Sequence, residues 1–381
     1  MRLALVHQRY NAYGGNERLV SRALSALKAN GTLDVTLIAR RWDDDAGWHT
    51  RRVDPYSLTR IGRDRSFAKA AAACFHEYDV VQSHDRIPGA TIFRAGDGVH
   101  ASWLEQSRRV HGAGGTITRR LSGYDSHLLE AEAQMFAHSA LKCVMCNSRM
   151  VADDIVHRFG VDEGRIALIY NGVDPALYNP GLVRHRAAWR QQHAVAADAP
   201  LLAYVGSGFA KRGVATALAA IAPFPEVHLA IAGTDKRVQR FVELAERSGL
   251  SNRVRFLGTL PNARPLYGAA DAFILPSLYD PFPNACAEAF ASGLPVFTSP
   301  TCGAAEWVHS RENGWVLDAL DVEGYRSALS EWLRRRPDWP AMREAAHKAG
   351  EPYTLERMVR DLTALYQRLA NPAPRLDPFQ V

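Results

Sequence analysis

Residues 201–232, LLAYVGSGFAKRGVATALAAIAPFPEVHLAIA, contain the pattern that determines the fold class. The apolar run 201–205 predicts a buried strand, and the glycine-containing loop 206–213 follows it directly. Residues 214–221 place apolar side chains at helical spacing, and 227–232 form the next apolar run. A strand, a helix and a second strand in this order are typical of a doubly wound parallel sheet.

The same order of elements opens the chain, where apolar runs at 3–6 and 35–39 flank a helical pattern. We therefore expect an α/β protein with two Rossmann-like doubly wound domains, residues 1–172 and 173–352, facing a deep cleft. The segment 353–381 begins with an amphipathic helix that we expect to pack back onto the first domain. Because ligands of such sheets bind at the carboxyl ends of the strands, the cleft is the expected site.

Composition excludes several classes of protein. The chain has 381 residues, 47% of them hydrophobic, which argues against a disordered protein. No uncharged apolar run reaches the ~18 residues of a membrane span. The first apolar run is too short for a secretory signal, so we expect a cytoplasmic protein. A net charge of +6 favours an anionic partner, but the dispersed basic residues and the lack of a known motif disfavour nucleic acid.

Several cofactor motifs are absent from the sequence. No GxGxxG follows the first strand of either half, which disfavours a nicotinamide or flavin enzyme, and no P-loop motif occurs. Cys143 and Cys146 lie in an apolar run and are interpreted as buried thiols rather than a redox pair. Asp43-Asp44-Asp45 is interpreted as a solvated acidic loop. We therefore expect no resident cofactor and no metal site.

The segment after the predicted strand 272–275 carries two acidic residues. Asp280 lies in the loop, and Pro283 stands where the first residue of a helix is expected. This helix should run to about Ser292 and end at Gly293. Glu288 projects from it.

The start of this helix is a candidate phosphate site. The backbone N–H groups of Asn284 and Ala285 are expected to face a phosphate there. Asp280 and Glu288 would then bind hydroxyl groups on either side of it. The alternative interpretation is structural: Asp280 would stabilise the N-terminus of its own helix, and Glu288 would be exposed to solvent.

Lys211 and Arg212, in the loop after strand 201–205, form a second candidate site. Adjacent cations beside a helix N-terminus can stabilise a departing diphosphate. The alternative interpretation, which is the commoner case for a Lys-Arg pair, is a solvated basic turn on the surface. Gly14 and Gly15 form the third candidate site, because glycines let the backbone approach a phosphate or sugar closely. The alternative interpretation of these two glycines is a tight turn.

The fourth candidate site is Asp97 and His100, which follow the expected strand 90–93 and are flanked by glycines. Polar residues at the end of a strand are site candidates. The residues themselves do not show which of the two would act.

These segments together resemble family 4 of the retaining glycosyltransferases with the two-domain GT-B fold, and within it the lipopolysaccharide-core glucosyltransferases. The resemblance is carried by GGNER, AGDGVH, GSGFAKRG, YDPFPN and EAFASGLPV, which occur in the family's order. Asp280 and Glu288 match its E-x7-E signature, with aspartate in place of the first glutamate. The resemblance covers nearly the whole chain and implies a metal-independent hexosyltransferase that uses a nucleotide sugar, with UDP-glucose as the first expectation.

The resemblance also implies roles for the candidate residues. Asp280 would bind hydroxyls of the donor sugar, and Glu288 the ribose. Lys211 and Arg212 would bind the diphosphate. Asp97 or His100 would bind sugar hydroxyls from across the cleft or shield the oxocarbenium-like centre. The expected acceptor is a growing glycan such as lipopolysaccharide core or another surface polysaccharide.

Residues 103–121 interleave arginines with apolar side chains. One interpretation is reversible docking on the anionic cytoplasmic face of the inner membrane. The alternative is a mobile glycine-rich surface loop.

Two other functions remain open at this stage. A non-hydrolysing UDP-sugar epimerase would share the architecture but need no acceptor. A non-catalytic protein that binds a nucleotide sugar or a membrane would show no turnover.

Overall fold

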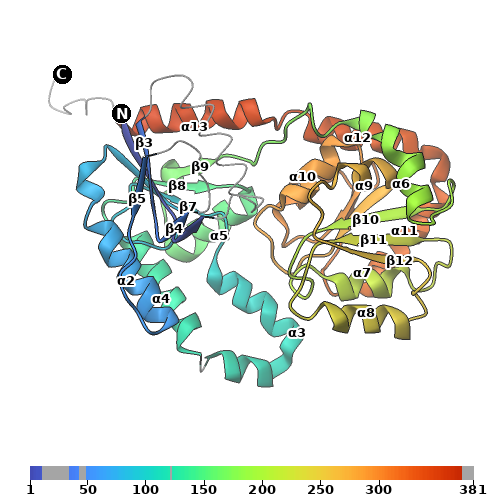
Figure 1. Cartoon of the computed structure of the whole chain (residues 1–381), viewed down its shortest axis with the longest axis horizontal. Coiled ribbons are helices and arrows are strands. Elements are labelled where there is room, and N and C mark those ends of the chain that lie inside the picture. The colour runs from blue at the N-terminus through green and yellow to red at the C-terminus, as the bar shows by residue number, and fades with distance from the viewer. Residues whose placement is uncertain (11–33, 43–48, 121, 371–381) are drawn as a thin grey trace. The chain divides into compact units, whose positions relative to one another are not determined.

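The computed structural model describes residues 1–10, 34–42, 49–120 and 122–370. The chain forms two compact units. The first unit consists of Met1–Ala101, His111–Tyr170 and Leu355–Val381, and the second of Ser102–Val110 and Asn171–Thr354. Both units are α/β, and their parallel sheets confirm the predicted fold class (Figure 1).

The described part of the first unit contains a seven-stranded sheet in the order β5-β3-β1-β6-β7-β8-β9, with every pair parallel. The chain leaves β1 for β3 on one side and later returns to β6 on the other. The strands are β1 (Arg2–Val6), β3 (Asp34–Ala39), β5 (His49–Arg52), β6 (Val80–Ser83), β7 (Ile92–Arg94), β8 (Cys143–Cys146) and β9 (Ile166–Leu168). β2 (Arg9–Tyr10) and β4 (Arg41–Trp42) form a separate parallel pair.

The helices that begin in the first unit follow their local capping signals. Thr59 accepts a hydrogen bond from the Gly62 N–H at the start of α2, and Ser148 accepts one from Val151 at the start of α5. Gly160, with φ +62°, ends α5. The helices are α2 (Arg60–Ala72), α3 (His100–Arg120), α4 (Gly123–Ala137), α5 (Arg149–Phe159) and α13 (Leu355–Ala370).

The second unit has a six-stranded parallel sheet in the order β12-β11-β10-β13-β14-β15. Here the strand order reverses between β10 and β13. The strands are β10 (Leu201–Val205), β11 (His228–Ala232), β12 (Val254–Gly258), β13 (Ala272–Leu275), β14 (Val296–Thr298) and β15 (Gly314–Val316). Their nearly continuous burial explains the uninterrupted apolar runs of the sequence, because helices cover both faces of the sheet.

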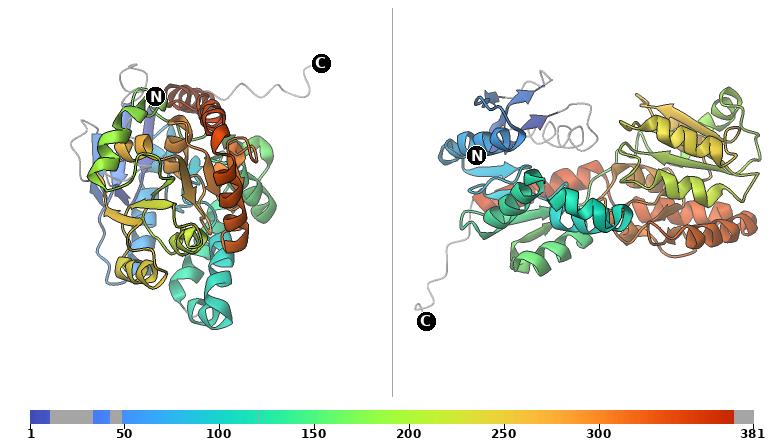
Figure 2. Two further views of the ribbon diagram at one scale, coloured as in Figure 1. Left: turned by 90° about the vertical axis from the view of Figure 1, so that its right-hand side faces the viewer. Right: turned by 90° about the horizontal axis from the view of Figure 1, so that it is seen from below.

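Figure 1 shows α7 and α8 on one face of the second sheet and α9, α10 and α12 on the other. The right-hand view of Figure 2 looks onto the face with α7 and α8. The helices are α6 (Arg186–Gln192), α7 (Val214–Ile221), α8 (Val238–Arg247), α9 (Arg264–Ala269), α10 (Asn284–Ala291), α11 (Val322–Arg334) and α12 (Trp339–Gly350). Short 3₁₀ helices lie at Phe75–Glu77, Glu163–Arg165, Pro180–His185, Gly303–Trp307 and Arg336–Asp338.

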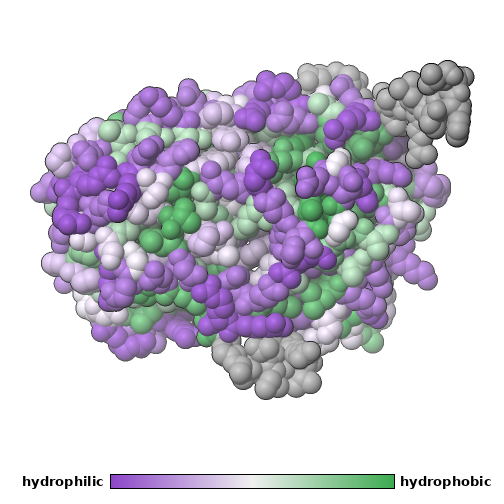
Figure 3. Space-filling model, turned by 180° about the vertical axis from the view of Figure 1, so that it is seen from behind, coloured by the Kyte–Doolittle hydropathy of each residue, from purple (hydrophilic) through white to green (hydrophobic). Residues whose placement is uncertain are grey.

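The face of the molecule in Figure 3 is largely hydrophilic, with smaller apolar patches between the polar residues. Tyr56 and Leu58 are the most exposed large apolar side chains of the described residues, at 85% and 86%. No helix in the described part of the chain is long and apolar enough to cross a membrane.

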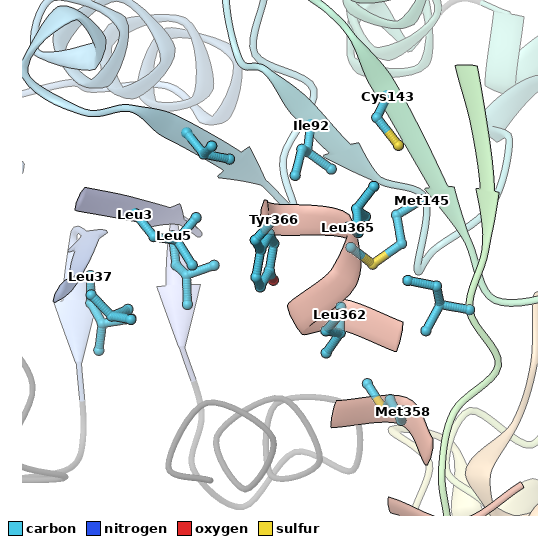
Figure 4. Close-up of a cluster of buried hydrophobic side chains, with 13 residues drawn as sticks. Leu3, Leu5, Leu37, Ile92, Cys143, Met145, Met358, Leu362, Leu365 and Tyr366 are labelled. Carbon is cyan, nitrogen blue, oxygen red and sulfur yellow. The ribbon is translucent and has the colours of Figure 1, made fainter. Parts of the chain in front are cut away.

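The helix α13 returns to the first unit and completes its core. Its residues Met358, Leu362, Leu365 and Tyr366 are buried, and Figure 4 shows them directed toward the strands. The strand residues that form this cluster with them include Leu3, Leu5, Leu37, Ile92 and Met145. The apolar stripe of the last helix therefore covers one face of the first sheet.

Three sequence interpretations can be compared with these elements. Cys143 and Cys146 are buried free thiols, as predicted, and burial raises their pKa to about 11 and about 12. The glycine-rich loop alternative for residues 103–121 is wrong, because α3 extends to Arg120. The placement of Pro283 as the first residue of α10 is also wrong. Its backbone is extended, at φ −73° and ψ 123°, and it precedes the helix as the N-cap.

Candidate active site

The loops after β10 and β13 lie together in the second unit. Because the strand order reverses between these strands, their carboxyl ends form the switch point at which open α/β sheets bind ligands. The N–H of Leu278 donates to the carbonyl oxygen of Lys211 at 2.9 Å. Gly213 has φ +73°, and a Cβ atom there would lie 2.0 Å from the carbonyl oxygen of Pro276. The two loops can approach this closely only with glycine at position 213.

Arg212 and Asp280 meet across these loops. The Nε of Arg212 donates to Oδ2 of Asp280 at 2.8 Å, and the side chains are 30% and 7% exposed. The charge of Asp280 raises the pKa of Arg212. Gly206 makes room for this arrangement, since a Cβ atom there would lie 3.0 Å from the guanidinium. A residue expected at the diphosphate thus contacts one expected at the sugar.

Lys211 lies between two aromatic rings. Its ammonium is 5.1 Å from the ring centre of Trp103 and 5.8 Å from that of Tyr279. Trp103 belongs to the part of α3 that groups with the second unit. Both distances are within the ~6 Å range of cation–π attraction. The rings therefore hold a cation beside the Arg212–Asp280 pair, and sequence analysis assigned neither ring to Lys211.

The N-terminus of α10 follows the same loop. Asn284 and Ala285 form its first turn, which contains no acidic residue. The amide of Asn171 donates to Oδ1 of Asn284 at 2.7 Å, so the side chain of Asn284 is held at the start of the helix. The first N–H groups of a helix have no partner within it, and the helix dipole favours an anion at this end. The arrangement suits a phosphate.

Glu288 lies one helical turn further along α10 and is half-buried. Its Oε2 accepts a hydrogen bond from the hydroxyl of Tyr267, in α9, at 2.8 Å. Tyr267 is fully buried. Sequence analysis missed this tyrosine, which looks like a core residue in the apolar run around it.

Comparison with known proteins identifies the family. Residues 13–177 match the family described as Glycosyltransferase Family 4, and residues 185–351 match Glycosyl transferases group 1. The chain therefore carries the family 4 and group 1 domains of a glycosyltransferase, in the GT-B fold. The resemblance inferred from the motifs is thereby confirmed.

Similar proteins include enzymes of glycan synthesis. Lipopolysaccharide glucosyltransferase WaaG of Escherichia coli K12 is 25% identical over 348 residues, 88% of this chain and 91% of WaaG. D-inositol 3-phosphate glycosyltransferase of Mycolicibacterium smegmatis is 27% identical over 300 residues, 76% of this chain and 67% of that enzyme.

Solved structures share the fold. A crystal structure of WaaG aligns with a TM-score of 0.81 at 24% identity, over 95% of this chain and 99% of that one. Anabaena HepE in complex with UDP-glucose aligns at 0.74 and 16% identity, over 96% of this chain and 99% of that one.

In the first unit of the glycosyltransferase, Asp97 lies in the loop after β7, and His100 is the first residue of α3. Asp97 is exposed, while Nε2 of His100 lies 3.0 Å from Oδ1 of Asp125. Burial lowers the pKa of His100, so the imidazole is neutral at pH 7. In that form Nε2–H donates to Asp125, and Nδ1 is an acceptor. Glu132 accepts from the His100 N–H at 2.8 Å and fixes the start of α3.

Further polar residues lie at the carboxyl ends of β1 and β6. The ring centres of His7 and His84 are 5.5 Å apart, and Gln82 lies 2.9 Å from Nε2 of His84. Tyr366, from α13, donates to the other end of the Gln82 amide at 2.7 Å. These residues lie at the switch point of the first sheet, and sequence analysis did not identify them.

Two sequence predictions involve residues outside the described part of the chain: the site at Gly14 and Gly15, and the acidic loop Asp43–Asp45. Within residues 1–10, 34–42, 49–120 and 122–370, no group of three or more histidine, cysteine or acidic side chains is placed to hold a metal ion.

Proposed function

We propose that this glycosyltransferase moves a hexose, first of all glucose from UDP-glucose, to a growing glycan such as lipopolysaccharide core. The observation that carries the proposal is the meeting of Lys211, Arg212 and Asp280 at the switch point, beside the N-terminus of α10. That site combines cations for a diphosphate with a carboxylate for sugar hydroxyls. The choice of glucose and of this acceptor is supported by the similarity to WaaG.

The proposed reaction retains the configuration of the sugar and uses no metal. Lys211, Arg212 and the N–H groups of Asn284 and Ala285 stabilise the charge that develops on UDP as the bond from C1 to the phosphate oxygen breaks. Asp280 binds a hydroxyl of the sugar. The acceptor oxygen bonds to C1 on the face that UDP leaves, and the leaving phosphate takes the acceptor's proton.

In the first unit, His100 and Asp97 are proposed to bind hydroxyl groups of a sugar. His100 is suited to this role because Asp125 fixes its ring while its neutral Nδ1 can accept a hydrogen bond. Asp97 is exposed at the end of β7 and offers a carboxylate.

The acceptor is proposed to be lipid-linked and to be reached from an anionic membrane surface through residues 103–121. Support comes from α3, a helix that carries the exposed Arg108 next to apolar side chains. Such a helix can bind a membrane surface reversibly.

The test is an assay with UDP-glucose, GDP- and ADP-sugars, with and without a glycan acceptor. We expect glucosyl transfer that needs the acceptor, continues in EDTA, and gives the α-linked product by nuclear magnetic resonance. A new nucleotide sugar formed without acceptor would show an epimerase instead. Binding of nucleotide sugars with no turnover on any acceptor would show a non-catalytic protein. A β-linked product would contradict retention.

A further inference from the structure

The hydroxyl group of Tyr267 donates a hydrogen bond to the carboxylate of Glu288. Its oxygen lies 2.8 Å from Oε2 of Glu288 and 3.3 Å from the carbonyl oxygen of Ala285, so the shorter contact receives the proton. Tyr267 comes from α9 and Glu288 from α10. A contact between the two helices therefore fixes the position of an acidic side chain.

The ring of Tyr267 has little freedom to move. It packs against Phe273 with ring centres 6.1 Å apart and meets the edge of Tyr178 at 5.8 Å. No part of Tyr267 is exposed. Burial, with the nearby charge of Glu288, raises the pKa of Tyr267 well above its usual value, so the phenol remains a donor.

The position of α9 in the second unit also relates Tyr267 to the ligand-binding edge of the sheet. It begins at Arg264, a few residues after β12 ends at Gly258. The loop between them starts at the carboxyl edge of the sheet, the same edge that carries the switch point between β10 and β13. Tyr267 thus connects this loop to the acid proposed for the ribose.

We infer that Tyr267 is a positioning residue, which holds the Glu288 carboxylate in the orientation that binds the ribose hydroxyls of the donor nucleotide. This inference rests on the proposed function, a transferase with a nucleotide-sugar donor, in which Glu288 takes the ribose-binding role that the family resemblance implies. A hydrogen bond from a neutral donor to a carboxylate is stronger than one between neutral groups, and its loss lets the side chain leave its position.

The test compares Tyr267→Phe with the wild type by calorimetric binding of UDP and of 2′,3′-dideoxy-UDP. The wild type should prefer UDP. The variant should bind UDP about tenfold more weakly, the loss expected for a hydrogen bond to a charged group, and should bind the dideoxy nucleotide unchanged. In a Glu288→Gln background the same substitution should have little further effect, because the two residues act as one unit.

Tyr325→Phe is the matched control. Tyr325 is also fully buried, and its hydroxyl donates to the carbonyl oxygen of Thr298 at 2.9 Å. Loss of the Tyr325 hydroxyl should lower the unfolding temperature without changing the preference for UDP over the dideoxy nucleotide. Equal weakening of both nucleotides by Tyr267→Phe, or no weakening of either, would overturn the inference while UDP binding by the wild type stands. A wild type that binds neither nucleotide would overturn the proposed donor, and the inference with it.

Discussion

The guanidinium of Arg212 illustrates what a single residue contributes here. It lies 2.8 Å from Asp280, which is only 7% exposed, so each charge compensates the other. Lys211, the neighbouring cation, is placed by the rings of Trp103 and Tyr279 instead. The two cations therefore differ in what their removal does to the fold. Loss of Arg212 leaves a buried carboxylate without its ion pair, which is costly.

Substitution of either cation tests its catalytic role. Lys211→Ala and Arg212→Ala should each lower kcat about 100- to 1000-fold, because leaving-group charge grows in the transition state. Nucleotide binding, measured as Kd, should weaken less. Thermal unfolding should show a clear loss of stability for Arg212→Ala, roughly 3 kcal/mol, and little for Lys211→Ala.

Lys348→Ala is the control, because this lysine is 68% exposed and its pair with Glu344 contributes little. A rise in KM with unchanged kcat would show that Lys211 and Arg212 only bind the donor.

The helix α3 brings together basic residues with different surroundings. Arg109 donates to Oδ1 of Asp318 at 2.9 Å, and this bond lowers the pKa of Asp318. Arg108 is exposed next to it. Arg109 is thus paired with Asp318, whereas Arg108 is exposed and is a candidate for contact with a membrane.

Vesicle binding tests this helix. The triple substitution of Arg108, Arg119 and Arg120 by Gln should weaken binding to anionic vesicles by about 3 kcal/mol, roughly a hundredfold. The same triple substitution by Lys keeps the charge and should bind like the wild type. Added salt should weaken wild-type binding, because the Debye length is only about 8 Å at physiological ionic strength.

Turnover of a soluble acceptor should be the same in all three proteins. Equal vesicle binding by the Gln variant and the wild type would contradict docking through α3.

Both units of the protein contain half-buried histidines, which are partly shielded from water in the fold. Burial lowers the pKa of His84, His100, His193 and His228. The unfolded chain then binds more protons than the folded one below the usual histidine pKa of about 6.5. Acidic groups affect the free energy of unfolding at lower pH. Hydrogen bonds from arginines hold the pKa of four of them below the usual values: Asp54, Glu77, Asp79 and Asp318.

The free energy of unfolding should therefore fall as the pH is lowered from 7 to 5. Each histidine that stays neutral in the fold contributes up to about 1.4 kcal/mol per pH unit below 6.5. Denaturant unfolding at several pH values measures the slope. His84→Gln should reduce it, whereas His49→Gln, at a side chain 82% exposed, should leave it as in the wild type. A stability that is constant over this range would contradict the prediction.

Local sequence determines most of the elements and part of the site. Apolar runs predict β10 and β13, and helical spacing predicts α7 and α13, because burial imposes a period on the chain wherever an element packs. The loops with Lys211 and Asp280 were identifiable for the same reason, since polar residues and glycines follow a strand end. Pro283 was misplaced by one position because helix boundaries depend on backbone angles that composition does not set.

Contacts between distant segments were decided only by the tertiary structure. The Arg212–Asp280 pair joins residues 68 positions apart, and it exists because β10 and β13 are neighbours in the sheet although β11 and β12 separate them along the chain. Tyr267 looks like one more apolar core residue in the sequence. Only its position opposite Glu288 distinguishes it, because a buried hydroxyl must find a partner and the fold alone determines which one it meets.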